Sequence, residues 1–168
     1  MNQGPRYRIK PRRQREGKTD YRKRLKLLKS GKPRIVIRRT LKHMRVQFIK
    51  YEEESDKVIA SAFSKELESS LNWKYSTSNI PAAYLTGLLA GKRAKEEGIE
   101  EAVLDIGRQL PVTNSKIFAS LKGVLDAGVE CPHDEKKLPD VERIKGNHIK
   151  KEVSSKVEDL KNKITGGK

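Results

Sequence analysis

The positive charge of this chain is confined to one stretch, residues 6–50. That stretch holds nineteen Lys and Arg residues against two acids, Glu16 and Asp20, a net charge of +17. Residues 51–168 hold nineteen basic and twenty acidic side chains, so they contribute −1 to the total of +16. A soluble surface mixes both signs and does not need such segregation. Solvation explains any single lysine here, but the block as a whole predicts a surface for a polyanion.

The composition favours one modest domain with polar extensions. The chain has 168 residues, of which 35% are hydrophobic, below the roughly 45–50% of a typical globular chain. A single cysteine excludes an internal disulfide and favours a reducing compartment. We expect no secretory signal and no membrane span, because no apolar run approaches about 20 residues. A lipid-binding helix is also disfavoured, since residues 1–20 offer only Tyr7 and Ile9 for an apolar face. We therefore expect a cytosolic protein whose partner is nucleic acid.

The first 31 residues read as a basic arm and a short helix. Residues 1–19 hold two Pro, two Gly and seven Lys or Arg. They bury too little apolar surface to offset chain entropy, so we expect an arm that orders on binding. Thr19 or Asp20 then caps a helix over residues 21–29, which Ser30 and Gly31 end. Its basic side is expected to lie on a phosphate backbone.

Four strands are expected in the middle of the chain. Runs rich in β-branched residues at 34–40, 44–51 and 57–64 are separated by short connections, which predicts an antiparallel meander. A fourth, mostly apolar run at 101–107 predicts a further strand in the centre of the sheet. Residues 65–78 are polar and read as a loop, and residues 131–147 read as loop or short strand.

Two helices are expected to pack on this sheet. Asn79 caps the first, residues 80–97, and Ser115 or Asn114 caps the second, residues 116–127. In the first helix we expect the small residues to approach the sheet closely while the large ones fill the space between; they are Ala83, Gly87, Ala90, Gly91 and Ala94, and Tyr84, Leu85, Leu88 and Leu89. A third helix is expected over residues 151–164, with an apolar stripe formed by Val153, Val157, Leu160 and Ile164.

An enzyme would need a site, and the sequence offers little for one. The three histidines are scattered, and Cys131 with His133 makes half of a zinc ligand set at best. Cys131 has no evident activating base, so an inert thiol is expected. Asp105, inside an apolar strand, is expected to be held by backbone donors, and the three carboxylates at 52–54 to be solvated. We therefore predict no catalytic residue, no metal and no cofactor.

The nucleic-acid interpretation rests on more than charge. Tyr7, Tyr21 and Trp73 lie among or beside basic residues, where aromatic rings can stack on unpaired bases. Each has another reading, because Tyr21 can anchor its helix and Trp73 can cover the edge of the sheet. The chain has no helix-turn-helix spacing, zinc finger or heptads. A basic arm on an α/β domain suits folded RNA better than duplex DNA, because the arm can follow grooves and junctions.

Several segments, in one order, resemble a known family. They are DYRKRLKLL at 20–28, PRIVIR at 33–38, NIPAAYLTGLLAG at 79–91, KIFASLKGVLDAG at 116–128 and CPHD at 131–134. Together they are similar to the 5S rRNA-binding ribosomal proteins of the large subunit, the eighteenth universal large-subunit family, in its archaeal form. The resemblance runs from about Thr19 to His148.

The resemblance implies a three-layer α/β domain with a mixed sheet, the meander plus one further strand, packed by two main helices. It implies a structural constituent of the ribosome in the cytoplasm, bound in the central protuberance to 5S rRNA, large-subunit rRNA and neighbouring ribosomal proteins. The family's RNA contacts carry over to the basic segment and to nearby strand and loop positions. These residues are Arg6, Tyr7, Arg8, Lys10, Arg12, Arg13, Arg15, Lys18, Tyr21, Arg22, Lys23, Arg24, Lys26, Lys29, Arg34, Arg38, Arg39, Lys42, Arg45, Trp73, Lys74 and Arg108.

The expected organisation has three parts. Residues 1–31 form the basic arm and short helix, 32–133 the globular α/β RNA-binding domain, and 134–168 a charged, helical C-terminal extension. Two other functions stay open at this point. A general polyanion-binding, chromatin-like architectural protein would explain the charge, and an enzyme acting on RNA would use Asp105 or Glu52–Glu54 with Mg²⁺.

Overall fold

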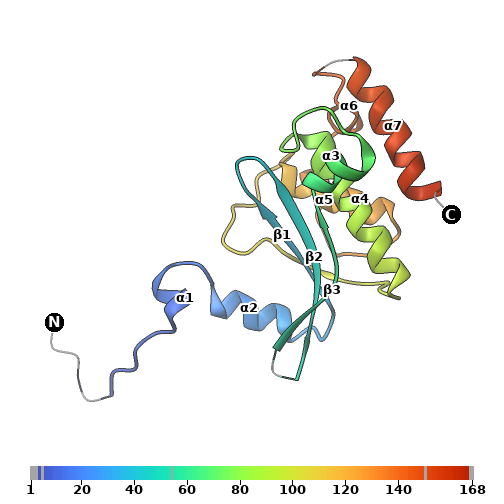
Figure 1. Cartoon of the computed structure of the whole chain (residues 1–168). Coiled ribbons are helices and arrows are strands. Elements are labelled where there is room, and N and C mark those ends of the chain that lie inside the picture. Colours follow the sequence, from blue (N-terminus) through green and yellow to red (C-terminus); the bar gives the residue numbers. More distant parts are fainter. Residues whose placement is uncertain (1–3, 5, 54, 150, 167–168) are drawn as a thin grey trace.

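The computed structural model describes Gly4 and residues 6–53, 55–149 and 151–166. Residues 1–3 and 5 of the expected arm, Glu54 of the acidic turn and Gly167 at the end of the expected tail lie outside the described residues. Figure 1 shows an α/β body from which the N-terminal segment projects to one side. A mixed sheet forms the middle of this body, and most of the helices lie on one of its faces.

The sheet has the strand order β3-β2-β1-β4 in the described residues. Strands β1 (Arg34–Arg39), β2 (Met44–Glu52) and β3 (Ser55–Phe63) pair antiparallel, which confirms the predicted meander. Alternate residues of β1 and β2 point into the core, so that Ile37 pairs with Val46 and both are fully buried.

Strand β4 (Val103–Asp105) pairs parallel with β1 and lies at the edge of the sheet, so its predicted central position is wrong. Strand β2 already pairs with one side of β1. The chain that returns to the sheet as β4 therefore pairs with the other, free side of β1. The run is nevertheless apolar because it is covered: Glu101 bridges to Glu130, and the Ala102 N–H donates to the Glu130 carbonyl at 2.9 Å. The segment around Glu130 thus covers the chain at the start of this run, and apolar residues therefore occur at an edge of the sheet.

Helices α4 (Ile80–Glu96) and α5 (Lys116–Asp126) pack on one face of the sheet, as predicted. The Asn79 side chain caps α4 by accepting from the Ala82 N–H at 2.8 Å, and Pro81 lies in the first turn. Ser115 is the N-cap residue of α5, but its side chain makes no cap hydrogen bond. The α/β class, the mixed sheet and the two main helices are thus confirmed.

The glycines of α4 face α5 and not the sheet, which corrects the expectation for this helix. A Cβ on Gly87 would lie 1.9 Å from the Ser120 carbonyl oxygen, and one on Gly123 would lie 2.1 Å from that of Tyr84. The two helices therefore touch backbone to backbone. Ala83, Ala90 and Ala94 of α4 join the core with the sheet, whereas Tyr84, Leu85 and Leu88 lie in a second cluster.

Replacing Gly87 by alanine should therefore destabilise the fold, although alanine is the better helix former. Forcing an extra carbon atom into a tightly packed interior typically costs about 1–3 kcal/mol. Urea unfolding would measure this loss. The matched control is Gly166→Ala in α7, where no group from another described part of the chain lies within 4 Å of the added Cβ. Equal stabilities of the two variants would contradict the close contact.

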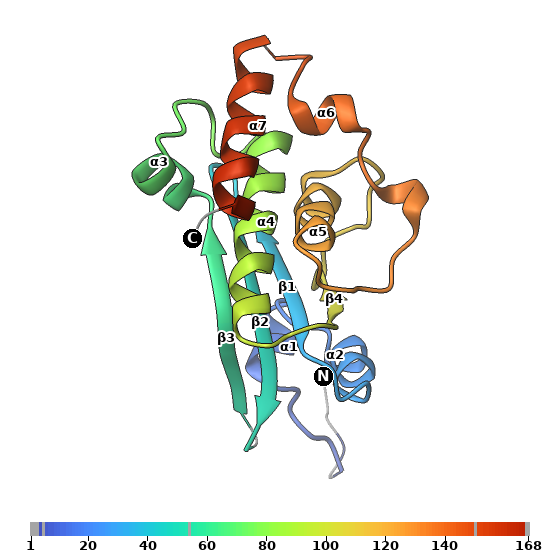
Figure 2. The same ribbon diagram turned by 90° about the vertical axis from the view of Figure 1, so that its right-hand side faces the viewer.

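The second cluster lies on the far side of α4. Helix α7 (Lys151–Gly166) buries its predicted stripe, including Val153 and Leu160, against Leu85 and Leu88 of α4. Figure 2 shows α7 running along α4, which in turn lies over the sheet. The segment expected as a charged extension thus packs on the body through this stripe, with α6 (Val141–Lys145) beside it.

Two segments expected as irregular contain helices. Helix α3 (Lys65–Leu71) occupies the first half of the expected loop 65–78, and Glu66 accepts from the Phe63 N–H at 2.8 Å at its start. Leu67 is the only buried residue of α3, so the sequence contains no apolar stripe from which this helix could be predicted. Residues 131–147 contain a 3-10 turn, η1 (Glu135–Lys137), as well as α6. Among the described residues, no helix combines the length and the apolar composition that crossing a bilayer requires.

Candidate nucleic-acid interface

The basic arm leads into a short, well-capped helix. Asp20, one of the two predicted caps, is the N-cap of helix α2 (Tyr21–Leu28), and its side chain accepts from the backbone N–H groups of Arg22 and Lys23. The chain turns after α2 at Gly31, where φ is +67°. Within the arm, one helical turn forms, α1 (Arg12–Arg15).

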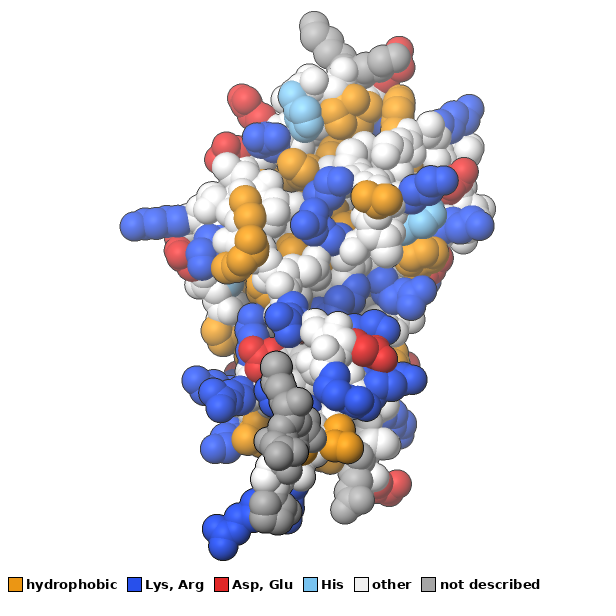
Figure 3. Space-filling model, turned by 90° about the vertical axis from the view of Figure 1, so that its left-hand side faces the viewer, with side chains coloured by type: hydrophobic (Ala, Val, Ile, Leu, Met, Phe, Trp, Pro, Cys, Tyr) orange, Lys and Arg blue, Asp and Glu red, His pale blue; other side chains and the backbone are white. Residues whose placement is uncertain are grey.

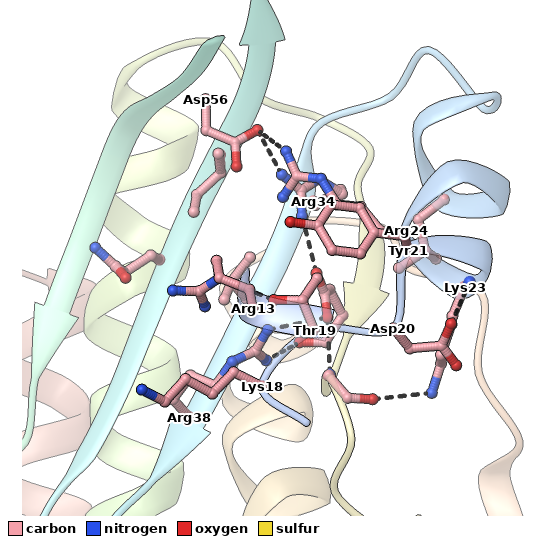
Figure 4. Close-up of a pocket in the computed structure, with 16 residues that line it drawn as sticks. Arg13, Lys18, Thr19, Asp20, Tyr21, Lys23, Arg24, Arg34, Arg38 and Asp56 are labelled. Atoms are coloured by element: carbon pink, nitrogen blue, oxygen red, sulfur yellow. Dashed lines mark hydrogen bonds and ion pairs between the residues drawn. The ribbon is translucent and has the colours of Figure 1, made fainter. Parts of the chain in front are cut away.

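Five charged residues tie this helix to the sheet, and we call them the Arg34 hub: Arg24, Arg34, Arg38, Asp56 and Asp105. Arg24 and Arg34 each donate to Asp56 Oδ1 at 2.8 Å. Arg34 also donates to Asp105 Oδ2 at 2.8 Å, and Arg38 donates to Asp105 Oδ1 at 3.1 Å. Figure 4 shows Arg24, Arg34 and Asp56 meeting between α2 and the strands. The hub joins α2, β1, β3 and β4.

Arg34 lies at the centre of the hub and is only 2% exposed. The expectation that it contacts RNA is therefore wrong, because its guanidinium is enclosed and its two terminal nitrogens bind two carboxylates, while Nε has no hydrogen-bond partner among the described residues. Asp105 is also buried and accepts from the Gly107 N–H at 2.8 Å. It is thus held by a backbone donor, as expected, and by two arginines that sequence reasoning did not assign to it.

The pKa of Asp105 reflects two opposing influences. Burial by itself raises this pKa, but the attraction of Arg38, the Gly107 N–H and the attraction of Arg34 outweigh burial, so the net pKa lies below the ordinary 3.8. A lowered carboxyl pKa stabilises the fold fully above pH 3.8. That contribution is lost as the pH falls through the folded-state pKa, which lies below this value.

The effect of Asp105→Asn on stability should therefore depend on pH. Near neutral pH we expect the variant to lose about 1.5–3 kcal/mol, the usual size for hydrogen bonds to charged groups. The difference between the two proteins should begin to shrink below pH 3.8, because the carboxyl then takes up a proton in the unfolded chain, and it should vanish once the pH has fallen through the lower folded-state pKa. Urea unfolding at pH 7 and at about pH 3 measures both differences. A difference that stays constant over this range would contradict the ion-pair role.

A polar cleft of about 510 Å³ opens between α2 and the sheet, beside the hub. Arg13 and Lys18 of the arm, Tyr21 of α2, Arg38 of β1 and Gln47 of β2 line it. Figure 4 shows that these parts of the chain face one another across this space. Lys23 closes one side by donating from Nζ to the Gly107 carbonyl at 3.3 Å. Residues far apart in sequence thus form one concave, cationic surface.

A second hollow continues this surface. Lys18 and Arg38 line it as well, together with Arg39, Arg108 and Gln109. Arg39 Nε donates to the Gln109 side chain at 3.2 Å, which joins β1 to the loop after β4. Lys42 and Lys74 lie elsewhere, around a third hollow near the turn between β1 and β2.

Most of the predicted cations are exposed and have no acid within ion-pair distance in the described part of the chain. The exceptions are Arg24, Arg34 and Arg38 of the hub and the pair Arg12 and Lys18, which bind Glu16. The exposed, unpaired group is Arg6, Arg8, Lys10, Arg13, Arg15, Arg22, Lys23, Lys26, Lys29, Arg39, Lys42, Arg45, Lys74 and Arg108. Figure 3 shows Lys and Arg crowded around the projecting arm.

The three aromatic candidates differ in exposure. Tyr7 is 50% exposed and Tyr21 is 38% exposed, so both present ring surface. Trp73 is 1% exposed, packs edge-on against Tyr75 and donates from its indole N–H to the Ser76 carbonyl. The stacking expected for Trp73 is therefore wrong. It belongs to the second cluster, with α4 and α7, and it does not cover the edge of the sheet.

The other candidate sites are structural. Cys131 is buried, and burial raises the pKa of its thiol to about 11, so the reactive thiolate is scarce at neutral pH. Glu52 pairs with Lys50 and Lys57 in the hairpin between β2 and β3. No group of three metal-ligating side chains occurs among the described residues.

The chain is similar to known proteins over most of its length. A family model described as ribosomal large subunit proteins 60S L5 and 50S L18 matches residues 5–100. Large ribosomal subunit protein uL18 of Korarchaeum cryptofilum is 58% identical over 149 residues, 89% of this chain and 76% of the relative. The proteins of the same name from Aeropyrum pernix and Haloarcula marismortui are 54% and 51% identical, and the alignments cover 89% of this chain and 70% and 79% of those relatives.

Proposed function

Because this chain belongs to the family of large-subunit ribosomal proteins 60S L5 and 50S L18, we propose that it binds 5S rRNA and helps to dock it to the large rRNA. The family is structural and not enzymatic, and its members belong to the large subunit of the cytoplasmic ribosome, with rRNA and other ribosomal proteins as partners. The identity of the RNA, and the central protuberance as the location, are the proposed part.

One observation carries this proposal: the unpaired cations gather on the arm, on α2 and beside the cleft between α2 and the sheet. Lys and Arg on such a concave surface neutralise phosphates from RNA strands that lie close together. Phosphate contacts position the RNA more than they identify it. Tyr7 and Tyr21, which present ring surface, are proposed to stack on unpaired bases.

We assign the RNA contacts to the exposed members of the predicted set. They are Arg6, Tyr7, Arg8, Lys10, Arg12, Arg13, Arg15, Lys18, Tyr21, Arg22, Lys23, Lys26, Lys29, Arg39, Lys42, Arg45, Lys74 and Arg108, with Arg38 at the mouth of the cleft. The division into an arm and helix (1–31), an RNA-binding body (32–133) and a C-terminal segment (134–168) stays part of the proposal.

A competition gel shift tests the proposed specificity. Labelled 5S rRNA is bound, excess tRNA is added and the salt is raised stepwise. We expect the complex to survive a large excess of tRNA, because shape recognition adds to the phosphate contacts. Displacement by stoichiometric tRNA would instead favour a general polyanion-binding, architectural protein, whose affinity for duplex DNA and 5S rRNA would be similar.

A further inference from the structure

Helix α2 is held against the sheet almost without a hydrophobic interface. None of its residues is fully buried: Leu27 and Leu28 are half-buried, and Leu25 is 56% exposed. Its polar ties are the pair between Arg24 and Asp56 of β3, with atoms 2.8 Å apart, and the longer bond from Lys23 Nζ to the Gly107 carbonyl. Because packing fixes this helix so weakly, the Arg24–Asp56 pair is a main determinant of its orientation.

Asp56 is itself fixed from the side of the sheet. Its Oδ1 accepts from the buried Arg34 at 2.8 Å, and Arg34 is anchored a second time by Asp105. The carboxylate that meets Arg24 is therefore already oriented. An acid in the most basic part of a protein opposes polyanion binding by simple charge. We therefore expect Asp56 to have a structural role that offsets its unfavourable charge in RNA binding.

The geometry of α2 suggests that role. Successive residues of an α-helix are about 100° apart, so Arg24 lies on the opposite side from the stripe formed by Arg22, Lys26 and Lys29. Arg24 is half-buried, and the three residues of the stripe are exposed. A contact that fixes Arg24 on the sheet therefore fixes the direction in which this stripe points.

We propose that Asp56 is a positioning residue for RNA binding: held by Arg34, it fixes Arg24 and thereby directs the exposed basic stripe of α2 toward RNA. This inference rests on the proposed RNA-binding function and adds to it a residue that does not touch RNA. It makes a prediction opposite to that of simple charge. Removing this carboxylate should weaken binding, although the protein becomes more positive.

The first test compares two variants that each remove one negative charge from the same hairpin. Asp56→Asn should bind 5S rRNA about threefold to fivefold more weakly than the unchanged protein, the scale of a partly exposed ion pair. Glu53→Gln is the control, because Glu53 is exposed and makes no ion pair in the described part of the chain. It should bind as well as the unchanged protein or slightly more tightly. An Asp56→Asn affinity equal to that of the control overturns the proposal.

A second comparison separates positioning from general destabilisation. Asp56→Asn should cause little further loss in an Arg24→Gln background, because its partner on α2 is already gone. Thermal unfolding of each variant shows whether the body stays folded at the binding temperature. A loss of affinity that is undiminished in the Arg24→Gln background would mean that Asp56 does not act through Arg24, and would overturn the proposal.

A third measurement needs no RNA. Spin labels are placed by Lys26→Cys on α2 and Glu96→Cys on α4, both exposed positions, while buried Cys131 stays protected. Asp56→Asn should broaden the distribution of distances between the labels, and Glu53→Gln should not. Equal widths overturn the positioning role. This readout is independent of the gel shift, so failure of 5S rRNA specificity and failure of the positioning role are distinguishable.

Discussion

Replacing Arg34 by glutamine should lower the free energy of unfolding by about 3–5 kcal/mol, the usual cost of leaving a buried charge without its partner. The Arg34 side chain is 3% exposed and binds both Asp56 and Asp105. Its loss leaves Asp105, whose side chain is 9% exposed, with only the partly exposed Arg38 as a cationic partner. Equilibrium unfolding in urea at neutral pH measures the loss.

Two further variants make this test specific. Arg38→Gln also removes a guanidinium from Asp105, but the Arg38 side chain is 42% exposed, so we expect a loss nearer 1 kcal/mol. Arg34→Lys keeps the charge, yet one ammonium group does not reproduce the geometry of a guanidinium between two carboxylates. It should be almost as unstable as Arg34→Gln. If Arg34→Gln were no less stable than Arg38→Gln, the hub would contribute little to the fold.

Deleting residues 1–19 should weaken binding to 5S rRNA by on the order of 10³-fold at about 0.1 M salt, if roughly four of its cations contact phosphates. The segment carries seven Lys and Arg residues against one acid. Each phosphate contact releases counterions, so the slope of log affinity against log salt should also flatten, by about 3. Gel shifts or fluorescence anisotropy over a series of salt concentrations give both quantities.

The control for this deletion removes charge from another part of the molecule. Lys161 and Lys163 are exposed on α7, and their double replacement by glutamine should leave the salt slope nearly unchanged. An arm deletion with an unaltered slope would show that the phosphate contacts lie elsewhere. The melting temperature of the deletion variant should stay close to that of the full chain, because no residue of α1 is buried.

Local signals in the sequence were enough for much of the fold. The Asn79 cap with Pro81 marks the start of α4, and alternating apolar residues mark the meander. The stripe that includes Val153 and Leu160 marks α7. These features depend on residues close together in the chain, where periodicity and capping act. Helix α2 was likewise predicted from its cap candidates and from the stop at Ser30 and Gly31.

The errors concern contacts between distant residues. In the sequence, Arg34 is one of many cations in a basic segment. Its burial depends on pairing with Asp105, which lies 71 positions later in the chain. Trp73 stands in a polar segment and is buried because α4 and α7 meet around it. Asp56 gave no signal, since its importance depends on Arg24 and Arg34 arriving from two other elements. Burial of a polar residue is decided by the assembled fold, which local periodicity does not report.

The two-sided burial of α4 has a consequence for how the chain folds during synthesis. One side of this helix is covered by the sheet and α5, but the side with Leu85 and Leu88 is covered by residues as late as Leu160 and Ile164. Until Val153 to Ile164 have left the translating ribosome, an otherwise folded chain exposes the apolar side of α4. Prematurely terminated chains therefore keep this side uncovered, and exposed apolar patches of this kind favour aggregation and capture by chaperones.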